Sequence, residues 1–234
     1  AMKVVQNLSE NSKKIVFLSN APRPSFKVIE FLKRMKMNEK FLSQVITSGE
    51  AAMYAINQNK FGKKFYHLGP SRDQSIFEKV LENKTSLDNC DFILCTGLFD
   101  EHAEDLNYYK DLLKDYTSKK LICTNPDLTV HRGNIEELCA GAVAKTFETL
   151  GGKSIYYGKP YKAIYEMCFD LGEKVLAIGD NLRTDIKGAN NLNIDSLFIY
   201  NGVHRNEIKN NEELSALLKR YNVKTNFFQK ELKW

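Results

Sequence analysis

The sequence lacks several features that would place the protein in a membrane or outside the cell. No apolar run approaches the ~18 to 20 residues that a helix needs to cross a bilayer. No apolar stretch near the first residue leads to a small-residue cleavage site. The five cysteines are odd in number and include no C-x-x-C pair, which argues against a disulfide framework and a zinc site. We therefore expect a cytoplasmic protein with no membrane partner.

A strong charge of either sign is also lacking. The 34 basic and 29 acidic residues give a formal charge of +5. The basic residues stand in short scattered pairs, at 13–14 and 63–64 for example, and this pattern is typical of solvated faces. We expect no nucleic acid partner, whereas a small anionic metabolite suits the mild positive bias.

What the sequence contains is an alternation of short apolar runs and longer segments with helical period. The 234 residues suffice for one large domain or two modest ones. Runs rich in β-branched and aromatic residues predict strands at Ile15–Leu18, Phe65–Leu68, Phe92–Cys95, Leu121–Cys123, Ser154–Tyr157, Val175–Ile178 and Ser196–Tyr200. This order predicts an α/β fold with a parallel sheet.

Helices are expected in the segments between these strands. Met2–Leu8 has helical character and precedes the first strand, which is an unusual start for such a sheet. Ser25 is suited to cap a helix over Phe26–Met37, and Thr47 with Glu50 has the spacing of a capping box. A further helix is predicted over Ile135–Leu150, starting at Asn134 and ending at Gly151.

Ligands of an open parallel sheet bind beyond the carboxyl ends of its strands, and three strand ends carry suitable residues. Ser19 and Asn20 follow the first strand, where a hydroxyl and backbone N–H groups suit phosphate oxygens. Lys159 follows the strand at 154–157 and has a charge that would offset a phosphoryl group. Taken singly, these residues are better explained by an ordinary turn and a solvated lysine.

The third strand end carries two carboxylates. Asp180 follows the strand at Val175–Ile178, and Asp185 lies five residues later near a helix start. Mg²⁺ takes one or two carboxylates and keeps several waters, so Asp180 is a candidate ligand and Asp185 a supporting one. Alone, Asp185 also fits a helix cap. A hydroxyl, a lysine and two carboxylates at one sheet edge indicate phosphate chemistry.

These motifs resemble a known family. Residues 17–20, 158–160 and 179–185 look like motifs II, III and IV of the haloacid dehalogenase-like phosphohydrolases. The long segment between the second and third motif contains Thr124-Asn125-Pro126-Asp127 and resembles the class IIA (NagD-type) cap. The resemblance extends over nearly the whole chain.

The resemblance implies roles for individual residues. Ser19 and Asn20 would bind the phosphoryl oxygens, and Lys159 would offset charge on the phosphate and nucleophile. Asp180 would ligate Mg²⁺, and Asp185 would support that site in metal binding and catalysis. Further substrate contacts are expected from Arg23, Asn125 and Asp127. For each of these three, a turn or a surface ion pair is the alternative.

The resemblance also implies an architecture. We expect a Rossmann-like core formed by residues 1–58 and 153–234, with an inserted α/β cap of the C2 type at 59–152. A homodimer formed through the cap would fit the family. The expected substrate is a small phosphorylated metabolite, and the sequence does not choose among sugar phosphates, nucleotides and other monoesters.

One motif of the family has no counterpart in the sequence. The family's nucleophile is an aspartate of motif I, ahead of motif II, which forms an aspartyl-phosphate. Residues 1–18 contain no aspartate. Two functions stay open: a Mg²⁺-dependent phosphomonoesterase whose activity is impaired in this chain, or a non-catalytic relative that binds a phosphate ligand or a partner. For the sheet, we expect the strand at Ile15 to pair directly with the strand at Val175, or another chain to fill the gap.

Overall fold

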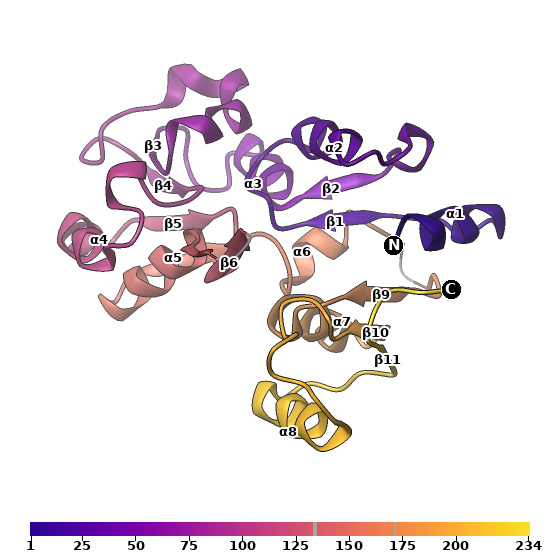
Figure 1. Ribbon diagram of the computed structural model, residues 1–234. Coiled ribbons are helices and arrows are strands. Elements are labelled where there is room, and N and C mark those ends of the chain that lie inside the picture. The colour runs from indigo at the N-terminus through magenta and orange to yellow at the C-terminus, as the bar shows by residue number, and fades with distance from the viewer. Residues whose placement is uncertain (133–134, 171) are drawn as a thin grey trace. The chain divides into compact units, whose positions relative to one another are not determined.

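The computed structural model describes residues 1–132, 135–170 and 172–234, and the chain divides into two compact units. Unit 1 consists of Ala1–Phe17, Lys33–Gln44 and Lys159–Trp234. Unit 2 consists of Leu18–Leu32 and Val45–Gly158. Helices and strands alternate along the chain, as Figure 1 shows. The domain limits implied by the family resemblance stay a prediction.

Unit 2 contains a four-stranded parallel sheet in the order β3-β4-β5-β8. Its strands are β3 (Phe65–Leu68), β4 (Phe92–Cys95), β5 (Lys120–Cys123) and β8 (Lys153–Tyr156). The α-helices of this unit are α2 (Ser25–Arg34), which ends in unit 1, α3 (Ser48–Asn57), α4 (Leu106–Leu113) and α5 (Ala140–Thr149). Short helical turns are η2 (Ser71–Ile76), η3 (Glu78–Asn83), η4 (Asp100–His102) and η5 (Lys114–Tyr116).

The two faces of this sheet bury two separate clusters, because successive side chains of a strand point to opposite faces. Ile93 and Cys95 face a cluster that also contains residues of α4 and α5, including Tyr109 and Phe147. Phe92 and Leu94 face a second cluster, formed with residues of α3 and η2. The sheet is therefore covered on both faces, as expected for parallel strands with apolar runs.

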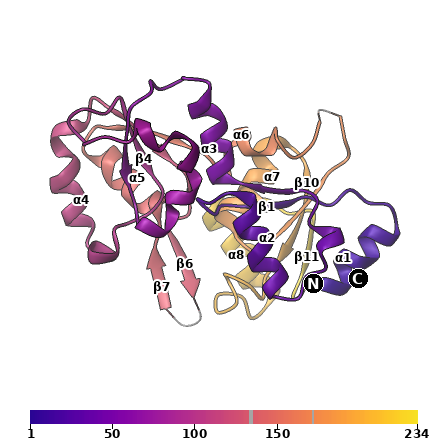
Figure 2. The ribbon, with the colours of Figure 1, turned by 90° about the horizontal axis from the view of Figure 1, so that it is seen from above.

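Two further pairs of strands belong to this part of the chain. β1 (Phe17–Ser19), which begins in unit 1, pairs with β2 (Val45–Thr47) in a two-stranded sheet. β6 (Thr129–Arg132) and β7 (Ile135–Leu138) form an antiparallel hairpin, whose two arrows lie side by side in Figure 2.

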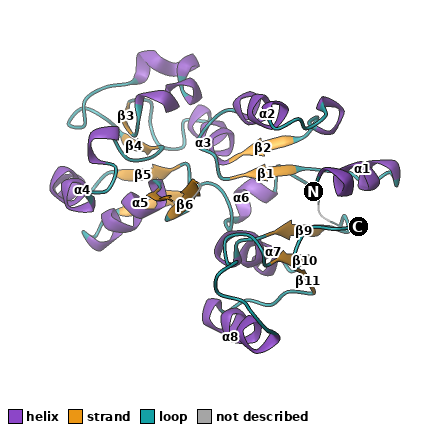
Figure 3. Cartoon of the chain, viewed as in Figure 1, coloured by secondary structure: helices purple, strands orange, loops and turns teal. Residues whose placement is uncertain are grey.

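Unit 1 contains a parallel sheet in the order β11-β10-β9. Its elements are α1 (Met2–Glu10), η1 (Glu39–Phe41), α6 (Lys162–Tyr165), β9 (Leu176–Gly179), the π-helical turn η6 (Leu182–Ile186), α7 (Lys187–Leu192), β10 (Asp195–Ile199), α8 (Asn211–Tyr221) and β11 (Phe227–Gln229). Figure 3 shows these strands with their helices. Phe198 of β10 packs against Leu182, Leu214 and Leu217 in the core of this unit.

The predicted α/β class is confirmed, and each of the seven predicted strands exists within two residues of its expected limits. The helix at the start of the chain is also confirmed. Of the predicted capping box, the cap by Thr47 is found, since its Oγ1 accepts a hydrogen bond from Glu50 N at 3.2 Å, whereas Glu50 Oε1 accepts from Ser25 N. The helix predicted over Phe26–Met37 begins one residue earlier, at Ser25, and ends earlier, at Arg34. Lys36 has a left-handed backbone, with φ of 65°, and this prevents the helix from reaching Met37.

The predicted helix over Ile135–Leu150 is wrong in its first part. Ile135–Leu138 form β7, and the helix begins at Ala140. The pairing of this segment with β6, in which Glu137 lies opposite Val130, satisfies its backbone groups in place of helical hydrogen bonds. Asn134, the expected start, lies outside the described residues. The short strands β2 and β11 were not predicted.

The direct pairing expected between the strands at Ile15 and Val175 is not found among the described strands. β1 pairs with β2, and β9 pairs with β10. The other expectation, that another chain fills the gap, stays a prediction.

Candidate active site

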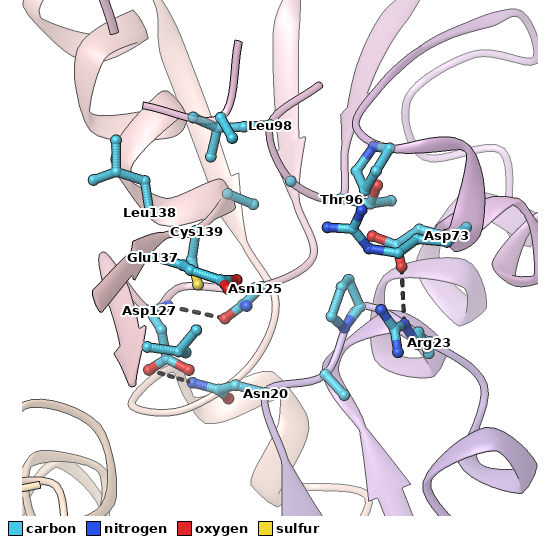
Figure 4. Close-up of a pocket in the computed structure, with 18 of the residues that line it drawn as sticks. Asn20, Arg23, Asp73, Thr96, Leu98, Asn125, Asp127, Glu137, Leu138 and Cys139 are labelled. Atoms are coloured by element: carbon cyan, nitrogen blue, oxygen red, sulfur yellow. Dashed lines mark hydrogen bonds and ion pairs between the residues drawn. The ribbon is translucent and has the colours of Figure 1, made fainter. Parts of the chain in front are cut away.

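Unit 2 contains a cavity of about 370 Å³ that brings together five of the predicted site residues. These are Ser19, Asn20, Arg23, Asn125 and Asp127. Figure 4 labels Asn20, Arg23, Asn125 and Asp127 among other residues of the lining. The lining comes from the loops after β1, β3, β4 and β5 and from the hairpin. The strand-end rule therefore predicted part of a real cavity.

Hydrogen bonds hold the predicted phosphate-binding loop and the loop after β5 together. Asn20 is 7% exposed, and its Nδ2 donates to Asp127 Oδ1 at 3.2 Å. Asp127 N in turn donates to Asn125 Oδ1 at 3.1 Å (Figure 4). Ser19 Oγ accepts a hydrogen bond from Ala21 N at 3.1 Å. Because this bond uses the hydroxyl as an acceptor, the Ser19 proton stays available for a phosphate oxygen.

Arg23 lines the same cavity and forms an ion pair with a buried carboxylate. Its Nε donates to Asp73 Oδ1 at 2.9 Å. Burial raises the pKa of Asp73, and hydrogen bonds from Arg23 and Thr96 oppose that shift. The guanidinium is therefore balanced in charge before any ligand binds.

Unit 1 brings together the other three predicted site residues. Lys159 Nζ lies 2.7 Å from Asp185 Oδ1. Asp185 Oδ2 accepts hydrogen bonds from the backbone N–H groups of Asp180 and Asn181, each at 3.1 Å. Asp185 therefore holds the lysine with one oxygen and the turn after β9 with the other.

Asp180 lies at the carboxyl end of β9, and a second loop fixes its side chain. Val203 N donates to Asp180 Oδ2 at 3.0 Å. A Cβ on Gly202 would lie 2.1 Å from that oxygen, so only glycine permits this close approach of the backbone. His204, in the same loop, also contacts the turn after β9, because its Nε2 accepts a hydrogen bond from Leu182 N at 3.3 Å.

The acidic residues of unit 1 fit a Mg²⁺ site that completes its shell with water and phosphate. Asp180 would supply the carboxylate ligand, and Asp185, engaged with Lys159 and two backbone groups, would position the turn that carries Asp180. No group of three or more His, Cys, Asp or Glu in the described part of the chain is arranged to hold a metal by itself. A bound Mg²⁺ would polarise a phosphoryl oxygen.

Several residues that line the cavity are not among those predicted from the sequence. Asp73 on η2 and Arg72 beside it gave no signal, because they pair with residues 50 and 28 positions away in the chain, Arg23 and Asp100. Thr96 directly follows β4, so the strand-end rule applied to that strand would have found it.

Known proteins resemble the chain in sequence and in structure. A family model described as haloacid dehalogenase-like hydrolase matches residues 1–81, and one described as HAD-hydrolase-like matches residues 156–220. No curated protein matches in a sequence search. No described helix has the length and apolar character that a membrane span requires.

Three solved structures illustrate the structural similarity. A haloacid dehalogenase-like hydrolase from Brucella suis 1330 has a TM-score of 0.84 and 26% identity, over 100% of this chain and 88% of that one. A possible sugar phosphatase from Cytophaga hutchinsonii has a TM-score of 0.78 and 17% identity, again over 100% and 88%. A p-nitrophenyl phosphatase from Archaeoglobus fulgidus has a TM-score of 0.72 and 19% identity, over 98% and 88%.

The motif positions, the two family models and these neighbours agree. Motif II lies within residues 1–81, and motifs III and IV lie within 156–220, where the models match. The chain belongs to the haloacid dehalogenase-like hydrolases, and its features fit class IIA of that superfamily.

Proposed function

We propose that this protein acts on small phosphomonoesters, in the manner of the phosphatases among its structural neighbours. The arrangement of Lys159, Asp185 and Asp180 at the end of β9 carries the proposal. A lysine held by one carboxylate next to a second, metal-competent carboxylate suits the charge of a phosphoryl group. In unit 2, the cavity that Ser19 and Asn20 line would hold the leaving group of the substrate.

Each residue has a stated task in this proposal. Ser19 and the Asn20 backbone bind phosphoryl oxygens, and Lys159 offsets their charge. Asp180 binds Mg²⁺, and Asp185 orients both Lys159 and the Asp180 turn. Asn125, Asp127 and Arg23 contact the leaving group. Since residues 1–18 contain no aspartate, we propose that the 234-residue chain by itself hydrolyses slowly or not at all.

The alternative is a non-catalytic relative that binds a phosphate ligand through the same residues. The two functions share Ser19, Lys159 and Asp180 and differ only in turnover. A cytoplasmic location is part of the proposal and is supported by the buried thiols Cys90, Cys95, Cys123 and Cys168, which form no disulfides. Homodimerisation stays a prediction.

The test combines hydrolysis of p-nitrophenyl phosphate with a binding measurement. Mg²⁺ with inorganic phosphate is expected to raise the melting temperature of the protein, and Asp180→Asn is expected to abolish this rise. Glu166→Gln, an exposed carboxylate paired with Lys162, is the control and should keep it. Slow hydrolysis that depends on Asp180 supports the phosphatase, binding without hydrolysis fits both functions of this 234-residue chain, and the absence of both binding and hydrolysis contradicts the proposal.

A further inference from the structure

A row of buried polar side chains leads from the sheet of unit 2 to Arg23 in the cavity wall. His67 belongs to β3, Thr96 follows β4, and Asp73 lies on η2. These three residues are 5%, 2% and 3% exposed. His67 Nε2 lies 2.8 Å from Thr96 Oγ1, and Asp73 Oδ1 accepts from Arg23 Nε at 2.9 Å. A hydrogen bond from Thr96 is also among the causes that oppose the rise in the pKa of Asp73. Buried polar groups that are hydrogen-bonded in this way fix one another's geometry.

The direction of the hydrogen bonds in this row can be deduced. Burial, together with the positive charge of Lys84, lowers the pKa of His67 to about 4, so the ring is neutral near pH 7. The Thr96 hydroxyl acts on the Asp73 carboxyl as a hydrogen-bond donor. A hydroxyl with its single proton committed can only accept from His67, which therefore carries its proton on Nε2. The donors all point toward Asp73, which is their final acceptor.

The consequence for Arg23 is a fixed orientation. Its Nε is committed to Asp73, and the side chain lies in the cavity lining, as Figure 4 shows. A guanidinium held through Nε keeps its two terminal nitrogens as donors for a ligand oxygen. Nothing in this arrangement needs a ligand to form first, so Arg23 is preorganised.

The charges of the cavity indicate what kind of oxygen Arg23 binds. Arg72, the other arginine among the described lining residues, is paired with Asp100. Both cations are therefore balanced by carboxylates. A carboxylate on the leaving group would repel the Asp73 carboxylate across Arg23, whereas a hydroxyl or carbonyl oxygen accepts from the guanidinium without that cost.

We propose that Arg23 selects leaving groups with uncharged oxygens, such as polyols and sugars, over leaving groups that carry a carboxylate. Asp73, Thr96 and His67 are positioning residues that hold Arg23 in place for this selection. The inference rests on the proposed function, because it places the leaving group of a phosphomonoester in the cavity next to Ser19. It concerns recognition and does not depend on turnover.

The test compares two ligands that share a carbon skeleton. Glycerol phosphate ends in a hydroxymethyl group and phosphoglycerate ends in a carboxylate. Calorimetric titration of the 234-residue protein with Mg²⁺ present is expected to give an affinity about tenfold higher for glycerol phosphate, on the scale of one buried polar contact. Asp73→Asn leaves the Arg23 charge unbalanced, and we expect it to reverse the preference.

Matched variants separate positioning from simple destabilisation. Thr96→Val removes only the hydroxyl and should abolish the preference, whereas Thr96→Ser keeps the hydroxyl and should restore it. Lys145→Gln removes an exposed cation that pairs with Glu148 on α5, outside the cavity, and should leave both affinities unchanged. If Asp73→Asn fails to fold, the two Thr96 variants still decide the matter.

Three results would overturn the inference. They are equal affinity for the two ligands, tighter binding of phosphoglycerate by the unaltered protein, and no binding of either ligand. A failure of the proposed function is recognised separately, as a lack of p-nitrophenyl phosphate hydrolysis together with no melting-temperature response to Mg²⁺ and phosphate. A protein that responds to phosphate but does not discriminate between the two esters contradicts only the inference about Arg23.

Discussion

Lys159 Nζ and Asp185 Oδ1 lie 2.7 Å apart, and their side chains are only 18% and 12% exposed. Asp185 also accepts two backbone hydrogen bonds from the turn after β9. The removal of one partner from a mostly buried ion pair takes away the charge that offsets the burial of the other. The pair therefore has a structural role in unit 1 besides its proposed role with phosphate.

The first prediction concerns this pair. Asp185→Ala should lower the free energy of unfolding by about 3 to 5 kcal/mol, since it leaves Lys159 buried and frees two backbone donors. Lys162→Ala breaks an exposed ion pair with Glu166 in the same unit. This control should change the free energy of unfolding by less than about 0.5 kcal/mol. Urea denaturation gives both values. A cost for Asp185→Ala as small as that of the control would contradict the role assigned to the pair.

The second prediction concerns the glycine next to Asp180. Gly202→Ala would place a Cβ 2.1 Å from Asp180 Oδ2, so the carboxylate must shift from its present position. We expect Mg²⁺ with phosphate to raise the melting temperature of this variant much less than that of the unaltered protein. Asn201→Ala, at the preceding exposed position, is the control and should respond normally. An unchanged response of Gly202→Ala would show that Asp180 tolerates displacement.

The third prediction is a pH dependence of stability caused by His67. The pKa of His67 is about 4 in the folded protein and near 6.5 when the chain is unfolded, so the unfolded state binds the proton more tightly. The stabilisation is complete above pH 6.5 and is lost as the pH falls toward 4. From pH 7 to pH 4.5 this group should lower the free energy of unfolding by about 2 kcal/mol.

His67→Gln provides the comparison for this pH dependence. The variant has no group that titrates at this position, so its stability should fall less between the two pH values. Asp73 contributes a pH dependence of the opposite sign, because burial raises its pKa. Both proteins contain Asp73. The difference between the two urea-denaturation series is therefore the relevant measure. Parallel series would show that His67 does not titrate below its usual range.

The fourth prediction concerns Tyr165, whose hydroxyl is buried and has no hydrogen-bond partner among the described residues. Tyr165→Phe removes an unsatisfied polar group and should leave stability unchanged or slightly higher. Gly188→Ala places a Cβ 1.8 Å from that hydroxyl and should cost about 1 to 3 kcal/mol.

The double variant tests whether this contact is the cause. Tyr165→Phe removes the atom nearest to the new Cβ but leaves ring carbons at 2.6 and 2.9 Å, so the clash is reduced and the combined cost should be smaller than the sum of the two single costs. Thermal denaturation of the four proteins completes the cycle. Additive effects would place the cause of the Gly188→Ala defect elsewhere.

The local sequence pattern predicted the strands of the parallel sheets better than it predicted the hairpin of β6 and β7. The runs at Phe65–Leu68 and Phe92–Cys95 are buried on both faces of a parallel sheet, and such strands are continuous apolar segments that a sequence reveals. The segment Ile135–Leu138 contains two glutamates and fits a helix start by composition. Its strand conformation comes from pairing with Thr129–Arg132, and composition alone does not report that pairing.

The candidate site was predictable where topology places residues and unpredictable where distant side chains meet. Ser19, Asn20 and Asn125 follow strands, so the strand-end rule or the motif reveals them. Asp73 is part of the site because it pairs with Arg23, which lies 50 positions earlier in the chain. His67 is connected to the site through its hydrogen bond with Thr96. Neither the spacing nor the periodicity of the sequence predicts a hydrogen bond of this kind.

The order of strands in the two larger sheets has a consequence for synthesis on the ribosome. The sheet β3-β4-β5-β8 uses only residues 65–156, and each added strand pairs with the one made just before it, apart from the intervening hairpin. It can be completed while translation continues. The sheet of unit 1 needs Phe227–Gln229 for its third strand, and that unit also contains Ala1–Phe17. Unit 1, which includes residues 1–17, is therefore complete only after residues 227–229 are made, and nascent chains should show protease resistance over residues 65–156 before they show it in unit 1.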